Sequence, residues 1–460
     1  MIKHPIKQFI FFSSACLWPL AAQATNGMNL ETYGPIAGGM GGAAIAYDNG
    51  NAGMMNNPAT LSLMEEGSRF DLALGLLAPD VRTTVPVEGG GSGRTEQSSA
   101  DAYYMPAAGW VRRDGDISYG IGMFAQGGMG TEYDASSDLA LMTGDNVKSE
   151  LSVGRLLFPL SVRINDRLSV GGSADFVWAG LDLKMAVPLS QMAGMSPGGS
   201  MAPMLNDANA TGTGNWGVGA DAARFDYDDG GPYSGDAFGT GYAGKIGLVF
   251  KATEHFVLGA SYHSKTWLND LETNDASLSM HDDTDGDPSN GAEAIATING
   301  KITVKNFQWP AFIGVGAAWQ ASPQLLLALD VKHIQWSEVL ASFDMRFETE
   351  MGDLTVSLPQ QWEDQTVVAM GAAYQVNEQL ILRGGYNHGD NPVPNSFVNA
   401  LFPATVESHY TLGFGYLFDA KQQLNFSLMR GKQSTVKNSQ TLIETSHSQL
   451  NWQLMYSYQY

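Results

Sequence analysis

Residue types that can do covalent chemistry are present, but their spacing matches no catalytic arrangement. The serine in Gly171-Gly-Ser-Ala-Asp175 follows two glycines, yet the second glycine of a G-x-S-x-G nucleophile elbow is missing. The histidines are few and scattered, without the H-E-x-x-H or i, i+4 pairs that bind zinc. No constellation supplies a nucleophile, a base and an orienting group together. The sequence therefore predicts a protein that is not an enzyme and that holds no metal or cofactor.

An acidic run, Asp283-Thr-Asp285-Gly-Asp287, resembles a calcium-binding loop. It lacks the full twelve-residue loop and the bidentate glutamate of an EF-hand. Because runs of like charge usually stay hydrated, a solvated acidic loop is the preferred interpretation, and calcium binding by residues 281–290 is left open.

The overall charge argues against a nucleic-acid partner. The chain carries 25 Lys and Arg against 47 Asp and Glu, a formal net charge of −22, whereas phosphate binding needs clustered cations. Charged residues make up only 16% of the chain, compared with about 25% in soluble domains. Glycine (54 residues) and aromatic residues (10%) are abundant. This composition suits a sheet that is surrounded by lipid.

The N-terminus has the layout of a secretory signal peptide. Lys3 and Lys7 precede an apolar stretch, and Ala22-Gln-Ala24 forms an A-x-A cleavage site. The apolar stretch is shorter than the roughly 20 residues that a membrane-spanning helix needs. Residues 1–24 are therefore predicted to be a signal peptide. Cys16, the only cysteine, lies within it, so the mature chain is expected to form no disulfide.

The C-terminal segment alternates between apolar and polar side chains. Successive side chains of a strand point to opposite faces, and one face here carries Leu450, Trp452, Leu454, Tyr456, Tyr458 and Tyr460. In an outer-membrane barrel such a face meets lipid, and the polar face lines the lumen. The same alternation recurs from Tyr410 to Phe418 and from Trp309 to Trp319, a band with a tryptophan at each end. It also recurs from Leu325 to Val331, where Asp330 and Lys332 face the other way.

Roughly 14 segments of this kind follow residue 68, an even number as single-chain bacterial barrels require. Two of the longest predicted segments are 298–320 and 324–347. Residues 69–460 are therefore predicted to form an all-β fold, a transmembrane antiparallel β-barrel of about 14 strands. Its short turns would be periplasmic, and its long loops, including a methionine-rich helical part of 189–210, would be extracellular.

Residues 25–68 differ from the barrel segments. They are rich in glycine, they do not alternate, and they precede the first good strand. A segment that is neither signal nor strand, and that comes before a barrel, most naturally folds inside the lumen. The sequence therefore predicts an N-terminal hatch, or plug, over residues 25–68.

The hatch sequence contains a glycine run that includes Gly38 and Gly41, followed by Asn57-Pro58-Ala59. These motifs, above all the triplet, resemble the hatch of the FadL family of long-chain fatty acid transporters, which includes TodX-like aromatic-hydrocarbon channels. The resemblance spans nearly the whole mature chain, although the long loops match poorly. It implies a 14-stranded barrel with an N-terminal hatch, in which a ligand enters from an extracellular groove and rests in an apolar pocket.

The resemblance also implies a release step. The N-terminus of the hatch would shift, and the ligand would leave sideways through an inward kink in a wall strand. Met28 and Leu30 lie where the hatch N-terminus would cap the ligand, with plain packing as the alternative. Gly127, Gly128 and Gly130 are candidates for the kink, because glycine interrupts ladder packing, although they could equally form a turn.

A fatty acid needs a cation for its carboxylate, because a buried unpaired charge is costly. Lys184 lies near a basic position of the family, and Arg346 is the inward-facing candidate on its strand; either could instead be a solvated lumen charge. Residues 354–362 contain no Lys or Arg where a second basic residue is expected. This departure keeps neutral aromatic hydrocarbons open as the alternative substrate.

The sequence thus predicts a channel in the outer membrane of a Gram-negative bacterium for passive uptake of hydrophobic molecules. Long-chain fatty acids are the first expectation and aromatic hydrocarbons the alternative. A general diffusion porin is a weaker alternative, because a porin has no use for the plug. The expected partners are outer-membrane lipid and lipopolysaccharide, and the barrel-assembly machinery during biogenesis. The chain is expected to be a monomer.

Overall fold

The computed structural model describes residues 26–86, 93–141, 143–196, 198–203, 220–228, 235–282 and 293–460. In this part of the chain 21 strands form a single sheet. The predicted signal peptide and the acidic run from Asp283 to Asp287 lie outside the described residues. The helices of the described part are all too short to cross a membrane.

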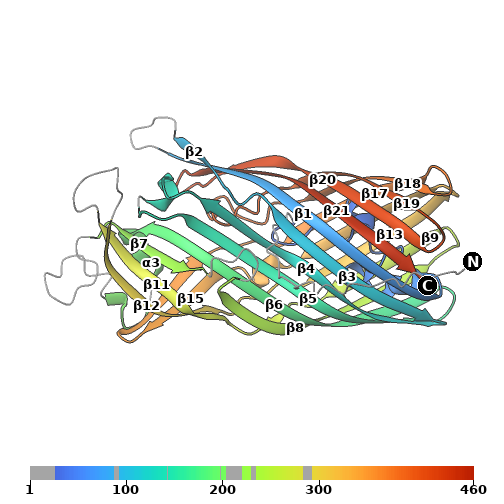
Figure 1. The fold of residues 1–460 in the computed structure, drawn as a ribbon, viewed down its shortest axis with the longest axis horizontal. Helices are drawn as coiled ribbons and strands as arrows, with labels where there is room; N and C mark the ends of the chain where they lie inside the picture. The colour runs from blue at the N-terminus through green and yellow to red at the C-terminus, as the bar shows by residue number, and fades with distance from the viewer. Residues whose placement is uncertain are drawn as a thin grey trace, which may run out of the picture.

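Fourteen of these strands pair in a closed antiparallel ring (Figure 1). The ring closes because the last strand pairs with the first, from Arg69–Gln459 to Thr84–Glu444. Closure satisfies backbone N–H and C=O groups that would otherwise lie unpaired in hydrocarbon. In ring order the strands are β1 (Gly67–Val85), β3 (Tyr103–Asp114), β4 (Ile117–Tyr133), β5 (Val147–Arg163), β6 (Leu168–Pro188), β8 (Ala237–Lys251), β9 (Phe256–His263), β13 (Phe312–Ser322), β14 (Leu325–Ile334), β17 (Gln365–Gln375), β18 (Leu380–Gly389), β19 (Ser408–Leu417), β20 (Gln422–Lys437) and β21 (Glu444–Gln459).

The other seven strands of the described chain extend the ring at one end. The sheet therefore has more strands than the roughly 14 predicted segments. Segment 298–320 is broken where Asn306 adopts a positive φ of 54° and where Pro310 lacks a ladder donor. Segment 324–347 is broken by a 3₁₀ turn at Trp336–Glu338. The additional strands are β2 (Arg94–Gln97), β7 (Ala222–Tyr227), β10 (Trp267–Leu268), β11 (Leu271–Asp282), β12 (Glu293–Lys305), β15 (Ser342–Thr349) and β16 (Gly352–Pro359).

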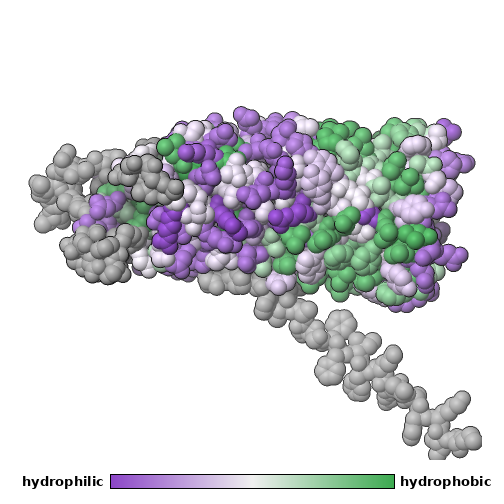
Figure 2. All heavy atoms as spheres, turned by 90° about the horizontal axis from the view of Figure 1, so that it is seen from above, coloured by the Kyte–Doolittle hydropathy of each residue, from purple (hydrophilic) through white to green (hydrophobic). Residues whose placement is uncertain are grey.

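The outer surface carries the predicted lipid-facing band. On β21 the side chains of Leu450, Tyr456 and Tyr458 are exposed, whereas Asn451 is buried, so the predicted alternation is confirmed there. Figure 2 shows hydrophobic residues gathered toward one end of the barrel and hydrophilic residues toward the other. The prediction for Trp309 is wrong: it precedes β13, turns inward and is 1% exposed.

The two ends of the barrel differ in their connections. The turns at 164–167, 252–255 and 376–379 are short and lie at the same end as the C-terminus (Figure 1). The additional strands β2, β7, β11 and β12 lie at the opposite end (Figure 1). Short turns of outer-membrane barrels face the periplasm and long loops face the exterior.

Residues 26–66, called the plug segment below, lie inside the ring. The segment contains α1 (Pro35–Gly38), α2 (Gly53–Asn56) and a 3₁₀ turn at Pro58–Leu63, and residues 26–64 are almost entirely buried. Wall side chains accept its backbone N–H groups: Asp330 on β14 binds those of Ala44 and Ile45 at 2.6 and 3.0 Å. Asp71 on β1 binds that of Asn51 at 2.7 Å. The segment is thus fixed to strands on different sides of the lumen.

The glycines of the plug segment allow this close contact with the wall. Gly41 has a φ of +70°, and a Cβ there would lie 2.6 Å from backbone atoms of Met370 and Tyr386. A Cβ at Gly38 would lie 2.6 Å from the hydroxyl of Ser427. Only glycine fits where two backbones meet this closely.

The Asn57-Pro58-Ala59 triplet forms a corner of the plug segment. The Asn57 amide donates to the carbonyls of Ile45 (2.7 Å) and Leu248 (3.2 Å), and its side-chain oxygen accepts the N–H of Ala59 (3.1 Å). Asn57 therefore joins two parts of the plug segment to strand β8, while Pro58 begins the 3₁₀ turn with no donor to satisfy.

The lumen is not polar along its whole length, in contrast to the expectation of a polar inner face. Around the plug segment it is polar, with Asp330, Lys332 and Arg383 among the wall side chains. Toward the long-loop end, buried apolar side chains fill it, including Val153, Val177, Phe225, Ile302 and Phe347. An apolar interior is the opposite of a water-filled porin channel.

Candidate functional site

An apolar cavity, called the inner cavity below, lies within the long-loop half of the lumen. Met28 of the plug segment faces it from one side, and strands and loops from around the ring supply the rest. Among the described residues, aromatic and aliphatic side chains dominate, and the polar groups are two uncharged amides and the indole N–H of Trp362. The lining residues are Met28, Leu151, Leu183, Met185, Phe307, Leu340, Phe343, Leu358, Gln360, Trp362, Asn399, Leu401 and Phe402.

Three tryptophans connect the inner cavity to the start of the plug segment. Trp362 lines the cavity and packs edge-on against Trp336, with ring centroids 5.1 Å apart. Trp336 packs in the same way against Trp309, at 5.7 Å. A Cβ at Gly27 would lie 2.6 Å from the Trp336 ring. The chain at Gly27 therefore lies directly against this aromatic row.

Strand β4 leaves the wall of the barrel near its middle. The β3–β4 register runs from Asp114–Ile117 to Ala108–Met123 and ends there. β3 continues along β1 up to Tyr103, while β4 continues along β5 with a bulge between Ala125 and Gly127. We call the resulting interruption of the wall, between residues 103–107 and 124–131, the wall gap.

The burial pattern shows that β4 bends inward at this point. From Ile117 to Ile121 the outward side chains of β4 are exposed, as lipid contact requires. From Gln126 to Thr131 residues on both faces are buried. A strand that stays in the wall keeps its alternation, so this part of β4 lies inside the barrel surface. A β-bulge is the usual cause of such a bend.

The three predicted kink glycines lie in this bent part of β4, and two of them bind the plug segment. Gly127 forms a backbone bridge with Asn29, and the N–H of Gly128 donates to the carbonyl of Met28 at 3.1 Å. A Cβ at Gly127 would lie 2.2 Å from that carbonyl oxygen. Gly130 faces β5, where a Cβ would lie 2.4 Å from the carbonyl of Ser149.

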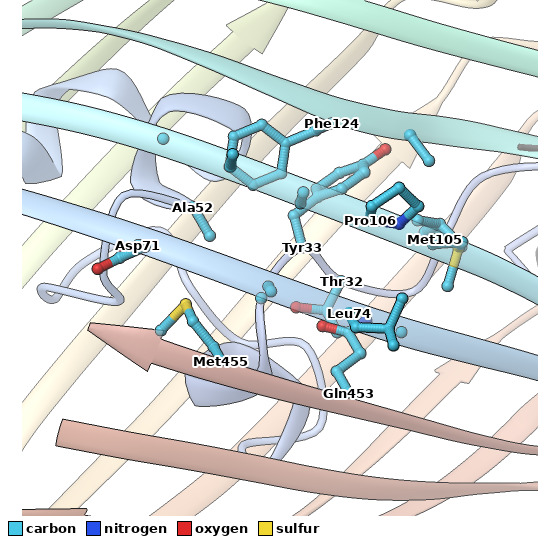
Figure 3. A pocket seen from close by; sticks show the side chains of 18 residues that line it. Thr32, Tyr33, Ala52, Asp71, Leu74, Met105, Pro106, Phe124, Gln453 and Met455 are labelled. Carbon is cyan, nitrogen blue, oxygen red and sulfur yellow. The ribbon is translucent and has the colours of Figure 1, made fainter. Parts of the chain in front are cut away.

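A second cavity, the wall pocket, lies at the wall gap (Figure 3). Leu30 and Tyr33 line it from the plug segment, and Phe124 lines it from β4. On β3 it is lined by Met105, which faces inward, and by Pro106, which faces outward. The pocket is thus lined by residues from both faces of β3. Its lining residues are Leu30, Thr32, Tyr33, Gly34, Ala52, Asp71, Ala73, Leu74, Gly75, Met105, Pro106, Ala107, Ala108, Gly109, Phe124, Ala125, Gln453 and Met455.

Residues 26–34, called the strap below, separate the two cavities. Met28 faces the inner cavity and Leu30 faces the wall pocket. Between them, the side-chain oxygen of Asn29 accepts hydrogen bonds from the Trp309 indole (2.6 Å) and from the Gln126 amide (3.0 Å). These hydrogen bonds hold the strap between the two cavities.

A third space, the outer groove, lies between α3 (Leu189–Met195) and the loop at 396–401. It shares five lining residues with the inner cavity: Met185, Leu358, Gln360, Asn399 and Leu401. Of the predicted methionine-rich loop, Met195 lines the groove and Met192 and Met201 are buried. Met204 and Leu205 lie outside the described residues.

Neither predicted cation lines the inner cavity. Lys184 lies between Leu183 and Met185, which do line it, and alternation turns Lys184 to the opposite face. There it contacts the carboxylates of Asp145 (3.5 Å), Asp226 (3.7 Å) and Asp228 (3.5 Å).

The predicted inward orientation of Arg346 is wrong. Its neighbours Met345 and Phe347 are fully buried, so Arg346 points outward, where it pairs with Glu348 and Asp353 at 3.3 Å each.

Glu31 lies within the strap and is its one carboxylate side chain. It is 3% exposed, accepts a hydrogen bond from Gln449 at 2.7 Å and lies 3.4 Å from His409. Burial disfavours its charged form and raises the pKa of Glu31 from 4.5 to about 7, although the hydrogen bond from Gln449 opposes this shift.

The raised pKa predicts that docking of the strap depends on pH. The docked strap holds its proton up to pH 7, whereas the released strap loses it near pH 4.5. Docking is therefore strongest at low pH and weakens as the pH rises through this window. Hydrogen-exchange protection factors of residues 26–34 are expected to fall more than about tenfold between pH 5 and pH 7.5. Glu31→Gln should remove this dependence, and an unchanged dependence in that variant would assign it to another group.

The described residues contain no group of three or more carboxylate, histidine or cysteine side chains arranged to hold a metal ion. The site is instead a set of neighbouring, mainly apolar spaces in a closed, lipid-embedded barrel. These features define a class of protein: an outer-membrane channel for hydrophobic compounds.

Comparison with known proteins identifies the family within this class. Residues 19–457 match the family described as "Outer membrane protein transport protein (OMPP1/FadL/TodX)", and the chain belongs to this family. Its members are transport channels, which confirms the prediction that the protein is not an enzyme. Outer membrane protein P1 of Haemophilus influenzae is 23% identical over 464 residues, covering 97% of this chain and 93% of that protein.

Two similar solved structures carry an assigned substrate. The toluene transporter TodX of P. putida is 32% identical, with a TM-score of 0.80 over 94% of this chain and 99% of that one. The toluene transporter TbuX of Ralstonia pickettii is 29% identical, with a TM-score of 0.74 over 94% and 99%. The predicted family and outer-membrane location are confirmed.

Proposed function

We propose that this protein takes up small neutral aromatic hydrocarbons across the outer membrane. The observation that carries the proposal is the lining of the inner cavity, which among the described residues is mainly aromatic and aliphatic and contains no cation. A fatty-acid carboxylate there would be buried without a partner, at a cost of several kcal/mol. An uncharged aromatic ring would instead meet Phe307, Phe343 and Trp362 in the edge-to-face or offset contacts that aromatic pairs prefer.

The proposed route has three steps. The compound enters the outer groove, passes the lining residues that groove and cavity share, and comes to rest beside Met28. The strap then moves away from Gly127 and Gly128, which opens the inner cavity to the wall pocket. The compound leaves sideways through the wall gap into the membrane. Such a route keeps an apolar solute in apolar surroundings throughout.

In this proposal the predicted hatch, residues 25–68, has two parts with different roles. The strap is the moving gate. The remainder is fixed to the wall through Asp330, Asp71 and Asn57 and blocks the lumen. Residues 1–24 direct export as a signal peptide.

Long-chain fatty acids are the second candidate substrate. The outer groove and the inner cavity share Leu358, Leu401 and three further lining residues, so an acyl chain in the cavity could keep its carboxylate in the open groove. This arrangement would need no cation in the inner cavity.

Uptake measurements in cells distinguish aromatic hydrocarbons from long-chain fatty acids as the substrate. A Gram-negative host that lacks its own hydrophobic channels would express this chain or an empty vector, and the initial rates of labelled toluene and labelled oleate uptake would be measured. We expect toluene uptake several-fold above the vector and oleate uptake near it. Oleate uptake without toluene uptake would reverse the assignment, and uptake of neither would contradict transport by this route.

A further inference from the structure

The outer face of β20 carries two cations immediately beyond the lipid-facing band. Arg430 and Lys432 are exposed and follow Leu428, which is itself exposed to lipid. Arg430 pairs across the sheet with Tyr410 on β19 and with Leu450 on β21. Both of these residues are exposed members of the band. Arg430 therefore lies at the level where the hydrocarbon ends and the lipid headgroups begin.

An aromatic row marks the same level on the neighbouring strands. Tyr386 on β18 contacts Tyr410, with ring centroids 5.2 Å apart, and its ring is parallel to that of His388. The Tyr386 hydroxyl and the His388 ring share the hydroxyl of Ser408, at 3.1 and 3.0 Å. Tyrosines of outer-membrane barrels lie at the membrane interface, where their rings are half in hydrocarbon and half in the headgroup layer.

Three cations on the outer surface of β12 and β15 are neutralised by neighbouring carboxylates. On β12, Lys301 pairs with Glu272 at 2.7 Å, and Lys305 pairs with Asp270 at 3.1 Å. Arg346 on β15 is paired in the same way.

The cations of β20 differ in this respect. Arg430 donates to the hydroxyl of Ser448 at 3.4 Å, and within the described ranges neither it nor Lys432 forms an ion pair. Asp80, the residue across from Ser448 on β1, is bound to Arg82 at 3.0 Å. This face thus presents positive charge that the protein itself does not compensate.

We propose that the outer face of β18–β21 at this level binds the phosphate groups of lipid A, the phosphorylated glycolipid of the outer leaflet. Arg430 and Lys432 supply the charge-assisted hydrogen bonds that phosphate oxygens require. The acyl chains of the same molecule lie along Leu428 and the rest of the band below. Figure 2 looks onto the face that is uppermost in Figure 1, where a hydrophobic surface passes into a hydrophilic one. The continuity of cations and lipid-facing surface favours a membrane lipid over a soluble anion or a protein.

Binding of lipid A by the purified full-length mature protein tests the proposal. Native mass spectrometry in a non-ionic detergent would measure the affinity for lipid A with both phosphates. Each cation at an anionic membrane surface contributes about 1 kcal/mol, so the Arg430→Ala/Lys432→Ala variant should bind about 30-fold more weakly. The Lys301→Ala/Lys305→Ala variant makes the same change in net charge on β12 and should bind as the wild type does. Migration in gels without boiling would show that each variant has a closed barrel.

Two further ligands distinguish binding of the phosphate groups of lipid A from binding of free phosphate. Lipid A without phosphates should bind the wild type as weakly as intact lipid A binds the Arg430→Ala/Lys432→Ala variant. Inorganic phosphate at millimolar concentration should fail to displace lipid A. The proposal would be overturned if the two forms of lipid A bound equally well or if the double variant kept the wild-type affinity. It would also be overturned if the β12 control lost as much affinity as the double variant, or if inorganic phosphate displaced lipid A.

Discussion

Deleting Gln126 is expected to stop uptake while the barrel still folds. Gln126 is the extra residue of the β4 bulge, because Ala125 pairs with Gly154 and Gly127 with Val153. Without it, β4 can continue straight and extend its ladder with β3 beyond Ala108. A continuous ladder would close the wall gap, since backbone pairing leaves no passage between strands. Labelled toluene uptake should then fall to the level of cells that carry an empty vector.

A substitution at the same position provides the control. Gln126→Ala keeps the number of residues in the bulge and removes only the hydrogen bond to Asn29 (3.0 Å). One such bond contributes about 1 kcal/mol, so transport should persist. Wild-type uptake by a well-folded deletion variant would show that hydrophobic compounds leave by another route.

Removing the strap, residues 26–34, is expected to eliminate tight binding of the substrate. The strap supplies Met28 to the inner cavity and Leu30 to the wall pocket, so its loss merges the two spaces. A bound ring that loses contact on one side exposes enough apolar surface to weaken its affinity about tenfold or more. Equilibrium binding of labelled toluene to the purified protein would measure the change.

The rest of the plug segment should stay in place in this variant, because Asp330 and Asp71 bind backbone N–H groups beyond residue 34. The thermal unfolding temperature should therefore change little. Met28→Leu is the matched control, since it retains an apolar side chain of similar volume and should bind nearly as the wild type does. Unchanged binding after removal of the strap would mean that the substrate rests outside the inner cavity.

The barrel could be predicted from sequence because a strand that separates lipid from lumen must alternate. The rows that end in Tyr460 and in Phe418 show this directly. The breaks in the wall could not be predicted in the same way. The band from Trp309 to Trp319 alternates perfectly in sequence, but the strand begins only at Phe312, after Pro310. Hydrophobic periodicity does not separate an apolar residue that faces lipid from one that faces an apolar lumen.

The candidate site could be predicted only in part, because its cavities are assembled from distant segments. A family resemblance predicts roles for Met28, Leu30 and the β4 glycines, and the structure places Met28 and Leu30 within the strap and Gly127 and Gly128 against it. The aromatic side chains of Phe307, Phe343 and Trp362 carried no local signal, because each reads as ordinary core.

The sequence predicts Lys184 as a carboxylate partner from its place near a basic position of the family, and Arg346 from its expected inward orientation. In a strand a shift of one residue moves a side chain to the opposite face. Their carboxylate partners lie on other strands, so the ion pairs that occupy these cations were not visible in the sequence.

The attachment of the plug segment has a consequence for the permeability of the cell envelope. If only residues 26–34 move while a compound crosses, the plug segment continues to block the part of the lumen around Asp330 and Asp71. No unbroken column of water then connects the two sides of the membrane. Hydrophobic compounds could then cross while ions and other water-soluble solutes remain excluded.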